Sequence, residues 1–333
     1  MKKTKAKLIS QVSQERLELG KHIPFLTPLV VYVEPSGYCN LKCRFCIQKT
    51  NGKMLKKDLM SKALFLKMID DIAEFPEKIK LLRVCGNGDP LINRDIIKML
   101  QYAKKKKVAE KIELITNGIM LNENLIENLP KFLNRLVISI EGLSSEDYWQ
   151  TSMAKINFDN LLNNISSLNL KKGKCALHIK IHNKAVFSEN KKKKFLEIFD
   201  DKCDQIYIEN LVPMWPQLDT DYFVDEFRWG GGKVIKRQVC AQIFKGVQVQ
   251  ADGDVVPCCV DWKRINILGN INKNSLSEIW KGEKLKELQI KHLTGNKGKV
   301  EPCKDCTMND YCEFDNIDQY TEECIKRLCG KML

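Results

Sequence analysis

The sequence predicts an α/β fold, in which a mainly parallel sheet with connecting helices is followed by a smaller, cysteine-rich α+β domain. Strand-like and helical segments alternate from residue 29 to about residue 212, and such alternation favours parallel strands joined by right-handed crossovers. Beyond that point the alternation stops, and eight of the 14 cysteines lie between Cys240 and Cys329. A chain of 333 residues is long enough for one large domain and a smaller one.

The predicted strands are short apolar runs, and the predicted helices carry apolar residues three or four positions apart. The strands are residues 29–33, 80–84, 111–116, 136–141, 176–181 and 205–208. The helices are residues 61–75, 93–105, 122–132, 157–168 and 189–199, with Ser61 and Asn93 as expected N-caps of the first two. Because the strands are expected to be parallel, the loops at their carboxyl ends should gather on one side, where barrel folds place their active sites.

The last third of the chain has a different pattern. Residues 214–217 and 228–233 are rich in Trp, Pro and Gly and indicate an irregular linker. Strand-like runs on either side of Asp252-Gly253 predict a β-hairpin, and a helix should begin at Ser275 and run to about residue 291. The expected divisions are therefore an N-terminal extension (1–28), the main α/β domain (29–225) and a C-terminal domain (226–333).

Composition narrows the class of protein. The net charge of +13 invites a nucleic-acid partner, but much of the excess lies in short lysine-rich runs beside predicted helices, where lysine usually faces water. Nucleic acid is therefore the less favoured partner. The chain has no apolar run of the ~20 residues that a spanning helix needs and no signal peptide pattern. We expect a cytoplasmic protein without a membrane partner, in which cysteines serve metal or redox chemistry rather than disulfides.

Three cysteines follow the first predicted strand in a C-x3-C-x2-C spacing: Cys39, Cys43 and Cys46. Thiolates are the soft ligands that iron–sulfur clusters need, and three of them leave one iron of a cubane open for chemistry. A zinc knuckle is the alternative interpretation. Zinc sites usually add a second cysteine pair or histidines, and this loop has neither.

This spacing, with Phe45 before the third cysteine, resembles the signature of the radical S-adenosylmethionine (SAM) enzymes. The resemblance implies a partial (β/α)6 barrel and a [4Fe–4S] cluster on Cys39, Cys43 and Cys46. In that family the open iron binds SAM, and one electron splits SAM into methionine and a 5′-deoxyadenosyl radical that abstracts hydrogen from the substrate. A flavodoxin or ferredoxin would supply the electron.

Three strand ends resemble the places where this family contacts SAM. The run Cys85-Gly86-Asn87-Gly88-Asp89-Pro90 is similar to the Gly-Gly-Glu-Pro motif that binds the SAM amino group, although aspartate reaches less far than glutamate. The third and fourth strands end in polar residues where the family contacts the ribose and the methionine carboxylate. Simple turn residues are the alternative interpretation. The residues expected at the cofactor are Phe45, Gly86, Asn87, Gly88, Asp89, Asn117, Ser139 and Glu141.

The C-terminal cysteines resemble the SPASM domain, an extension of radical SAM enzymes that carries auxiliary iron–sulfur clusters. The full pattern has a cysteine four residues beyond the one that matches Cys312, and here that position is Asn316. The reduced form, called a twitch domain, keeps one cluster, so we expect one auxiliary [4Fe–4S] cluster. A zinc ribbon is the alternative. The expected ligands are Cys240, Cys258, Cys303 and Cys306; a second cluster would need Cys312 together with Cys259, Cys324 or Cys329.

The resemblance implies an oxidoreductase. An auxiliary cluster can accept a second electron, so we expect a two-electron oxidation, in the manner of a dehydrogenase, of a sugar, cyclitol or similar small metabolite. Such a reaction also needs a base, and the weak candidates are Asp261 and Glu209. A maturase that modifies a peptide or protein is the alternative, less favoured because residues 1–28 are too few for an N-terminal peptide-recognition module. A non-catalytic metal-binding protein is the remaining one.

Overall fold

A computed structural model describes residues 6–8, 17–50, 55–214, 226–312 and 314–330. Most of the expected linker at residues 214–217 and the expected division at residue 225 lie outside these residues. Within them, ten strands form one sheet in the order β1-β7-β6-β5-β4-β3-β2-β8-β9-β10. The strands are β1 (Lys7–Leu8), β2 (Val30–Val33), β3 (Ile79–Val84), β4 (Ala109–Thr116), β5 (Arg135–Ile140), β6 (Ala176–His182), β7 (Gln205–Glu209), β8 (Gly246–Val249), β9 (Asp254–Val256) and β10 (Gly269–Asn270).

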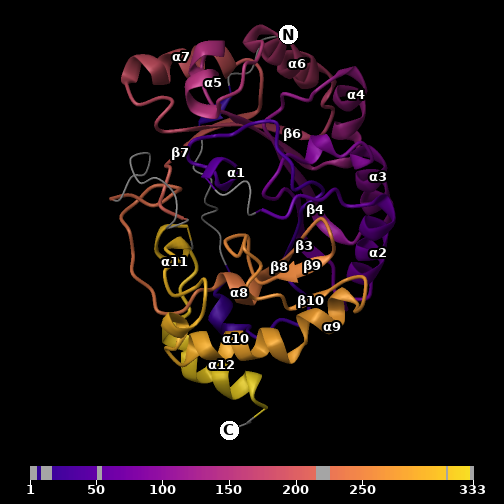
Figure 1. Ribbon diagram of the computed structural model, residues 1–333, viewed down its shortest axis with the longest axis vertical. Helices are drawn as coiled ribbons and strands as arrows, with labels where there is room; N and C mark the ends of the chain where they lie inside the picture. Colours follow the sequence, from indigo (N-terminus) through magenta and orange to yellow (C-terminus); the bar gives the residue numbers. More distant parts are fainter. Residues whose placement is uncertain (1–5, 9–16, 51–54, 215–225, 313, 331–333) are drawn as a thin grey trace.

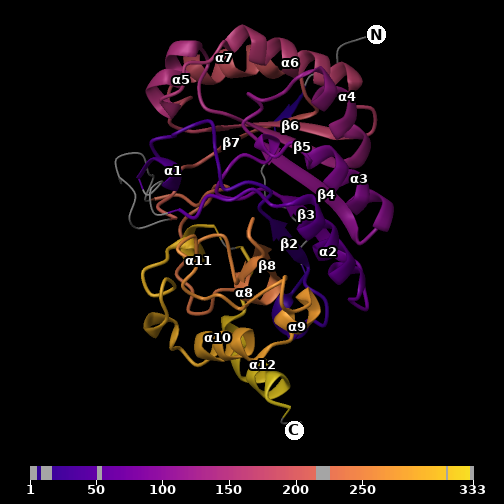
Figure 2. The ribbon, with the colours of Figure 1, turned by 45° about the vertical axis from the view of Figure 1, so that its right-hand side comes forward.

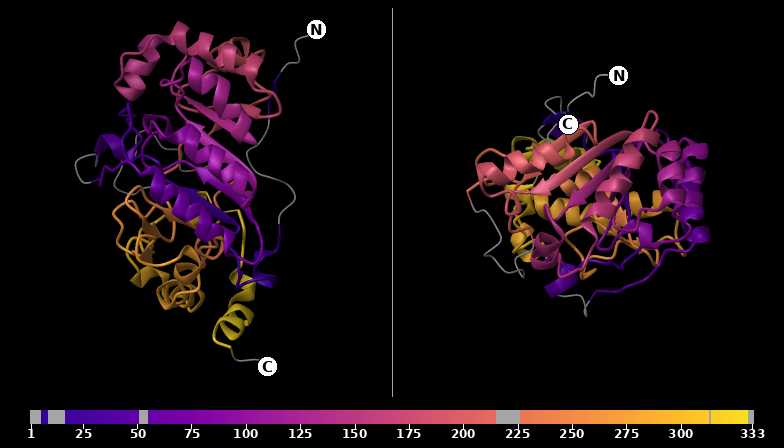
Figure 3. Two further views of the ribbon diagram at one scale, coloured as in Figure 1. Left: turned by 90° about the vertical axis from the view of Figure 1, so that its right-hand side faces the viewer. Right: turned by 90° about the horizontal axis from the view of Figure 1, so that it is seen from above.

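The six predicted strands are present as β2 to β7, and all of them pair in parallel. They form the partial barrel, with helices along its outer face (Figures 1 and 3). The helices are α1 (Ile47–Thr50), α2 (Lys62–Ala73), α3 (Ile96–Lys106), α4 (Glu123–Phe132), α5 (Ser145–Ser152), α6 (Phe158–Lys171), α7 (Glu189–Phe199), α8 (Gln242–Lys245), α9 (Leu276–Trp280), α10 (Glu283–Leu293), α11 (Met308–Tyr311) and α12 (Thr321–Leu328).

Local signals placed most helix starts correctly. Ser61 caps α2 by accepting a hydrogen bond from the Leu64 N–H, as predicted. The prediction for Asn93 was wrong, because α3 begins at Ile96. The Asn93 side chain instead donates to the carbonyls of Pro35 and Met60, at 2.8 and 2.9 Å. These long-range bonds orient the side chain so that its Oδ1 accepts from the Asp95 N–H at 3.0 Å, before the helix begins, and they tie the start of α3 to the loop that follows β2.

The C-terminal segment joins the same sheet, which the sequence did not predict. The expected hairpin is present as β8 and β9, with Gly253 in the left-handed conformation (φ 92°) that its turn requires. Strand β8 also pairs in parallel with β2, so the hairpin extends the barrel sheet at that edge. At the other edge, β1 pairs with β7. Two-residue and four-residue strands carry too little pattern to reveal such partners.

The hydrophobic core also runs across both parts of the chain. Val247 and Val249 of β8 pack in the same buried cluster as the strands and outer helices of the barrel. The indole N–H of Trp280 donates to the Phe25 carbonyl at 2.9 Å. Helices α9, α10 and α12 lie at the lower end of the molecule (Figure 2), where α10 and α12 share a second buried cluster with Leu19 and Ile23.

Among the described helices, none combines the length and apolar character that a bilayer crossing requires.

Candidate active site

The three N-terminal cysteines lie on the cluster loop, residues 35–46, between β2 and α1. Cys43 is buried, and Cys39 and Cys46 are half-buried. Burial raises the pKa of the Cys39 thiol to about 12 and that of Cys46 to about 11. Burial also raises the pKa of the Cys43 thiol well above its usual value, and the nearby Cys46 and Cys39 thiols add to this rise. Each thiol therefore resists ionisation on its own, and a bound cationic cluster would supply the charge that keeps thiolates stable in this place.

Helix α5, which the sequence analysis missed, holds this loop. The Lys42 N–H donates to the Ser152 carbonyl and the Arg44 N–H donates to the Thr151 carbonyl, both at 2.9 Å. These bonds come from the carboxyl end of α5 and fix the loop on both sides of Cys43. The helix was missed because its sequence is polar and only Tyr148 and Ser152 are buried.

The glycine turn, residues 86–89, packs directly against the cluster loop. The Asp89 N–H donates to the Tyr38 carbonyl at 2.8 Å. The Gln48 side-chain amide donates to the Asn87 carbonyl at 2.7 Å and to the Gly37 carbonyl at 2.9 Å. A Cβ on Gly88 would collide with the Tyr38 carbonyl oxygen. Glycine is therefore required at residue 88 for this close approach of two backbone segments.

Asp89 does not point its carboxylate at an open site. The side chain is 3% exposed, and its oxygens accept hydrogen bonds from the Thr116 hydroxyl and the Asn117 N–H, both at 2.8 Å, and from the Leu91 N–H at 2.9 Å. Burial nevertheless raises the pKa of Asp89. The carboxylate fastens the end of β4 to the turn, and its expected contact with SAM stays a prediction.

Asn117 lies between the end of β4 and the cluster loop. Its side-chain amide donates to Asn40 Oδ1 at 2.7 Å and lies 3.8 Å from the Cys39 sulfur. Its Oδ1 accepts from the Ile119 N–H at 3.0 Å. These contacts show that Asn117 holds the cluster loop, and its expected place at the cofactor stays a prediction.

The side chain of His182 contacts Phe45 on one side and approaches Glu141 on the other. The sequence analysis did not single out this histidine. The rings of Phe45 and His182 are 4.8 Å apart in an edge-to-face arrangement, and His182 Nε2 lies 3.7 Å from Glu141 Oε2. Burial raises the pKa of Glu141 to about 7 and lowers that of His182 to about 4. Ser139, two residues earlier on β5, is half-buried, next to Lys180 of β6 in register.

The auxiliary thiols, those of Cys240, Cys258, Cys303 and Cys306, come together from distant parts of the chain. Burial raises the pKa of Cys258 well above its usual value, and the nearby thiols of Cys259, Cys306, Cys240 and Cys303 add to this rise. Among the described residues, no group of three or more Cys, His, Asp or Glu side chains is arranged to share a single metal ion.

The other C-terminal cysteines are placed differently. The Cys312 sulfur lies 3.9 Å from the Met214 sulfur. Cys324 is completely buried in the second core cluster, where its thiol donates to the Gly20 carbonyl at 3.5 Å. Cys329 is exposed after α12. Because its thiol is packed in this core and bonded to the Gly20 carbonyl, Cys324 is not placed to bind a second auxiliary cluster.

Charged side chains form an inner wall across four neighbouring strands, β2 to β5. On β2, Val31 packs beneath the helices, so Tyr32 faces the inner side. In register across the sheet follow Arg83, Glu113 and Arg135. Arg83 pairs with Glu113 at 2.5 Å, and Arg135 pairs with the other oxygen of that carboxylate. Burial raises the pKa of Glu113, but the two guanidiniums outweigh it and lower the pKa overall.

Two cysteines outside both motifs lie beside this wall. Burial raises the pKa of Cys85 and of Cys259; the nearby Cys259 thiol adds to the rise at Cys85, and the Arg83 guanidinium opposes the rise at both. Cys259 also neighbours Cys258 and Cys306. The inner wall therefore continues to the auxiliary thiols.

The two candidate bases differ in their surroundings. Asp261 is 1% exposed, and its oxygens accept from the Ile265 and Asn266 N–H groups at 2.9 and 2.7 Å. It holds a loop together, so the structure favours a structural role. Glu209 ends β7 on the inner side, where Lys180 pairs with one oxygen at 2.8 Å and the Trp229 indole N–H donates to the other at 3.0 Å.

Comparison with known families decides the class of this site. The model of the Radical SAM superfamily matches residues 33–182, and the model of the SPASM iron–sulfur cluster-binding domain matches residues 240–307. The chain belongs to the radical SAM superfamily. Radical SAM and SPASM domains imply a [4Fe–4S] cluster, SAM and one or more auxiliary clusters, and the thiol-rich sites described above fit that donor chemistry.

Relatives agree on the fold and differ in what they act on. The chain is 23% identical, over 85% of its own length and 88% of the relative's, to a tungsten-containing aldehyde ferredoxin oxidoreductase cofactor-modifying protein of Pyrococcus furiosus. Among solved structures it is similar to Streptococcus suis SuiB bound to precursor peptide SuiA (TM-score 0.64, 16% identity, 89% of this chain and 73% of that one). It is also similar to BtrN in complex with AdoMet and 2-DOIA (0.56, 18%, 88% and 97%). At these identities the structures establish the fold alone.

Proposed function

We propose that this radical SAM enzyme carries out a two-electron oxidation of a small hydrophilic substrate, such as a sugar or cyclitol. The observation that carries the proposal is the inner wall. Tyr32, Arg83, Glu113 and Arg135 lie in register on the inner side of four neighbouring strands. Charged side chains that are only partly exposed favour a ligand with many hydrogen-bonding groups, because an apolar ligand would leave them unsolvated.

We propose that Cys39, Cys43 and Cys46 hold the SAM-binding cluster. When bound, the cofactors supply a hydrogen-abstracting radical at the cluster loop and an acceptor for the second electron at the auxiliary site. The protein's share is to hold the substrate in one orientation and to exclude water. The proposed auxiliary ligands are Cys240, Cys258, Cys303 and Cys306. A flavodoxin or ferredoxin is the proposed electron donor.

The substrate must also lose a proton, and Glu209 is the proposed acceptor. Its carboxylate lies at the carboxyl end of β7, the end at which barrel enzymes bind substrates. Lys180 and Trp229 hold both oxygens, which fixes the orientation of the group. Asp261 is not carried forward, because it is 1% exposed and lies in the loop after β9 instead of at the carboxyl end of a barrel strand.

The test uses anaerobically reconstituted protein with SAM, a reductant and a panel of deuterated sugars, cyclitols and peptides. The proposal predicts deuterium transfer into 5′-deoxyadenosine from a polyhydroxylated compound. Glu209→Gln should keep that transfer and form the oxidised product at least about 100-fold more slowly, the lower end of what general acid–base catalysis typically contributes. Transfer from a peptide alone would contradict the proposal.

A maturase acting on a peptide or protein is the second candidate. SuiB, the solved structure with the higher TM-score of the two compared above, was determined with a precursor peptide bound. The relative from Pyrococcus furiosus, which matches most of the chain, is described as a cofactor-modifying protein. The peptide arm of the same deuterium experiment separates the two candidates.

A further inference from the structure

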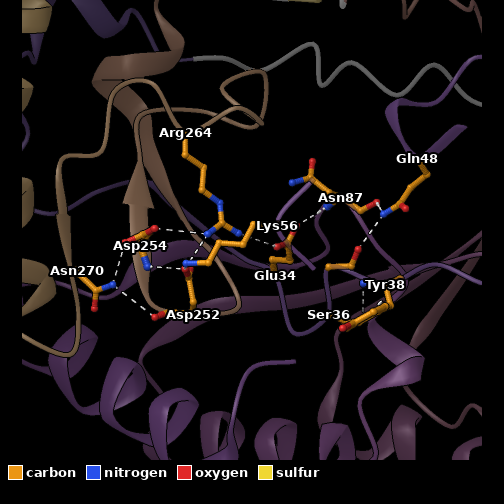
Figure 4. A network of polar contacts seen from close by, with 11 residues as sticks. Glu34, Ser36, Tyr38, Gln48, Lys56, Asn87, Asp252, Asp254, Arg264 and Asn270 are labelled. Atoms are coloured by element: carbon orange, nitrogen blue, oxygen red, sulfur yellow. Dashed lines mark hydrogen bonds and ion pairs between the residues drawn. The ribbon is translucent and has the colours of Figure 1, made fainter. Parts of the chain in front are cut away.

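A polar network connects the glycine turn to the loop that follows the auxiliary cysteine Cys258 (Figure 4). At its centre lies Arg264, whose side chain is 7% exposed. Its guanidinium pairs with Asp252 at 2.8 Å and Asp254 at 3.4 Å, and lies 3.9 Å from Glu34. Glu34 is the residue between β2 and the cluster loop and is completely buried.

The other oxygen of Glu34 holds the glycine turn. Glu34 Oε2 accepts the Asn87 N–H at 2.6 Å, and the Asn87 carbonyl accepts from Gln48 at 2.7 Å. The backbone of Asn87 is therefore fixed at both its N–H and its carbonyl, by one residue before the cluster loop and one residue after it. The Glu34 carboxylate fills the space beside Gly86 so closely that a Cβ there would collide with it.

The loop that carries Arg264 is built to present this side chain. Arg264 has φ 57°, a backbone conformation that non-glycine residues seldom adopt. Its N–H donates to the Asp261 carbonyl at 2.9 Å, and the Asp261 carboxylate accepts from the next two N–H groups. A costly local conformation that surrounding bonds enforce indicates a position under functional constraint.

We infer that Arg264 is a positioning residue for the glycine turn. It attracts one oxygen of Glu34 so that the other stays aimed at the Asn87 N–H, and thereby lets the auxiliary region set the geometry of the turn at which SAM is proposed to bind. The inference rests on the proposed assignment of that turn. It implies that SAM affinity depends on a residue that contacts neither SAM nor a cluster, because binding and positioning are linked.

Equilibrium dialysis of radiolabelled SAM against reconstituted protein of matched iron content tests this. Arg264→Gln should bind SAM about tenfold more weakly, a change of about 1.4 kcal/mol. Lys56→Met is the matched control, because Lys56 pairs with the same Asp252 and is separate from Glu34; it should bind SAM as the unaltered protein does. Wild-type affinity in Arg264→Gln overturns the inference.

A double variant tests whether Arg264 acts through Glu34. Glu34→Gln keeps an acceptor for the Asn87 N–H and removes the charge that attracts Arg264. If the two residues act as one unit, the combined variant binds SAM no more weakly than Arg264→Gln alone. Additive losses contradict action through Glu34. Should Arg264→Gln take up no iron, Asp252→Asn provides the same test, because it loosens the arginine but keeps its charge; unchanged affinity there overturns the inference.

Gly88→Ala separates this inference from the proposed assignment of the turn. Its Cβ would displace the turn from the Tyr38 carbonyl, so SAM binding should fall by at least about tenfold. If Gly88→Ala binds SAM normally, the turn is not the SAM site and the assignment fails. If Gly88→Ala is weakened and Arg264→Gln is not, only the role of Arg264 fails.

Discussion

The two groups of cysteines, at the cluster-loop end and at the auxiliary end of the molecule, are assembled in different ways. At the cluster loop, three cysteines lie on one short segment, and neighbouring strand ends and α5 hold that segment in place. At the auxiliary end, the four thiols are separated in sequence by the β8–β9 hairpin, by helices α8, α9 and α10 and by the loops between them. The first end is therefore a local structure on a finished barrel, whereas the second depends on how the C-terminal segment folds.

The largest expected effect is the loss of SAM cleavage when the cysteines of the cluster loop alone are removed. Replacing Cys39, Cys43 and Cys46 together by Ala should abolish SAM cleavage, because the three thiolates that hold the cluster would be lost. The thermal unfolding temperature should change little, since the loop is anchored by backbone bonds outside the three thiols. Measurement of 5′-deoxyadenosine and of thermal unfolding checks both parts. A large drop in unfolding temperature would contradict the local character of this end.

At the auxiliary end, Cys258→Ser should have a large effect of another kind. Loss of the cluster removes the link between the hairpin and the loop at Cys303, so the unfolding temperature should fall clearly, as metal binding contributes to folding. SAM cleavage should persist, while oxidised product should be lost with its electron acceptor. Undiminished product formation would show that the auxiliary site is only structural.

A smaller effect is expected where the turn meets β4. Thr116→Val removes the hydroxyl that donates to Asp89 at 2.8 Å and leaves a buried carboxylate with fewer donors. The free energy of unfolding should fall by about 1–3 kcal/mol, measured by urea denaturation with cluster content held constant. Ser61→Ala, at an exposed helix cap, is the control for loss of a single hydroxyl, at about 1 kcal/mol.

The last expected effect concerns how the free energy of unfolding depends on pH, through a histidine at the auxiliary end. Burial lowers the pKa of His292 on α10 to about 4, below the ~6.5 of an unfolded histidine. Between these values the unfolded chain binds more protons, so stability is complete above pH 6.5 and falls as pH decreases towards 4. His292 should cost about 2 kcal/mol between pH 7 and pH 5. His292→Leu should reduce the acid sensitivity by that amount, and an unchanged pH profile would contradict the shift.

The same contrast explains what the sequence could predict. The six barrel strands, the Asp252-Gly253 hairpin and the cap at Ser61 are each specified by residues close together in the chain. The pairing of β8 with β2 could not be predicted, because four residues fix no partner. The inward turn of Asp89 depends on Thr116 from another strand, and the displaced start of α3 depends on carbonyls that Asn93 reaches across the fold.

The candidate site divides in the same way. Motif spacing identified the cysteines and the glycine turn, because their chemistry depends on residue type and short distances. The roles of Arg264, Glu34 and His182 arise from contacts between distant segments. The charged inner wall was missed as well, because single alternating charges in strands are indistinguishable from solvated ones until the barrel closes around them.

The central claim is that the cluster loop holds one cluster and the auxiliary thiols hold another. Iron and sulfide content per chain is its most direct test. The account predicts about eight irons in reconstituted protein and about four in both the Cys39/Cys43/Cys46→Ala variant and Cys258→Ser. About twelve irons would mean a second auxiliary cluster that recruits Cys312. About four irons that vanish in the loop variant, with zinc retained, would contradict the auxiliary cluster and remove the proposed electron acceptor.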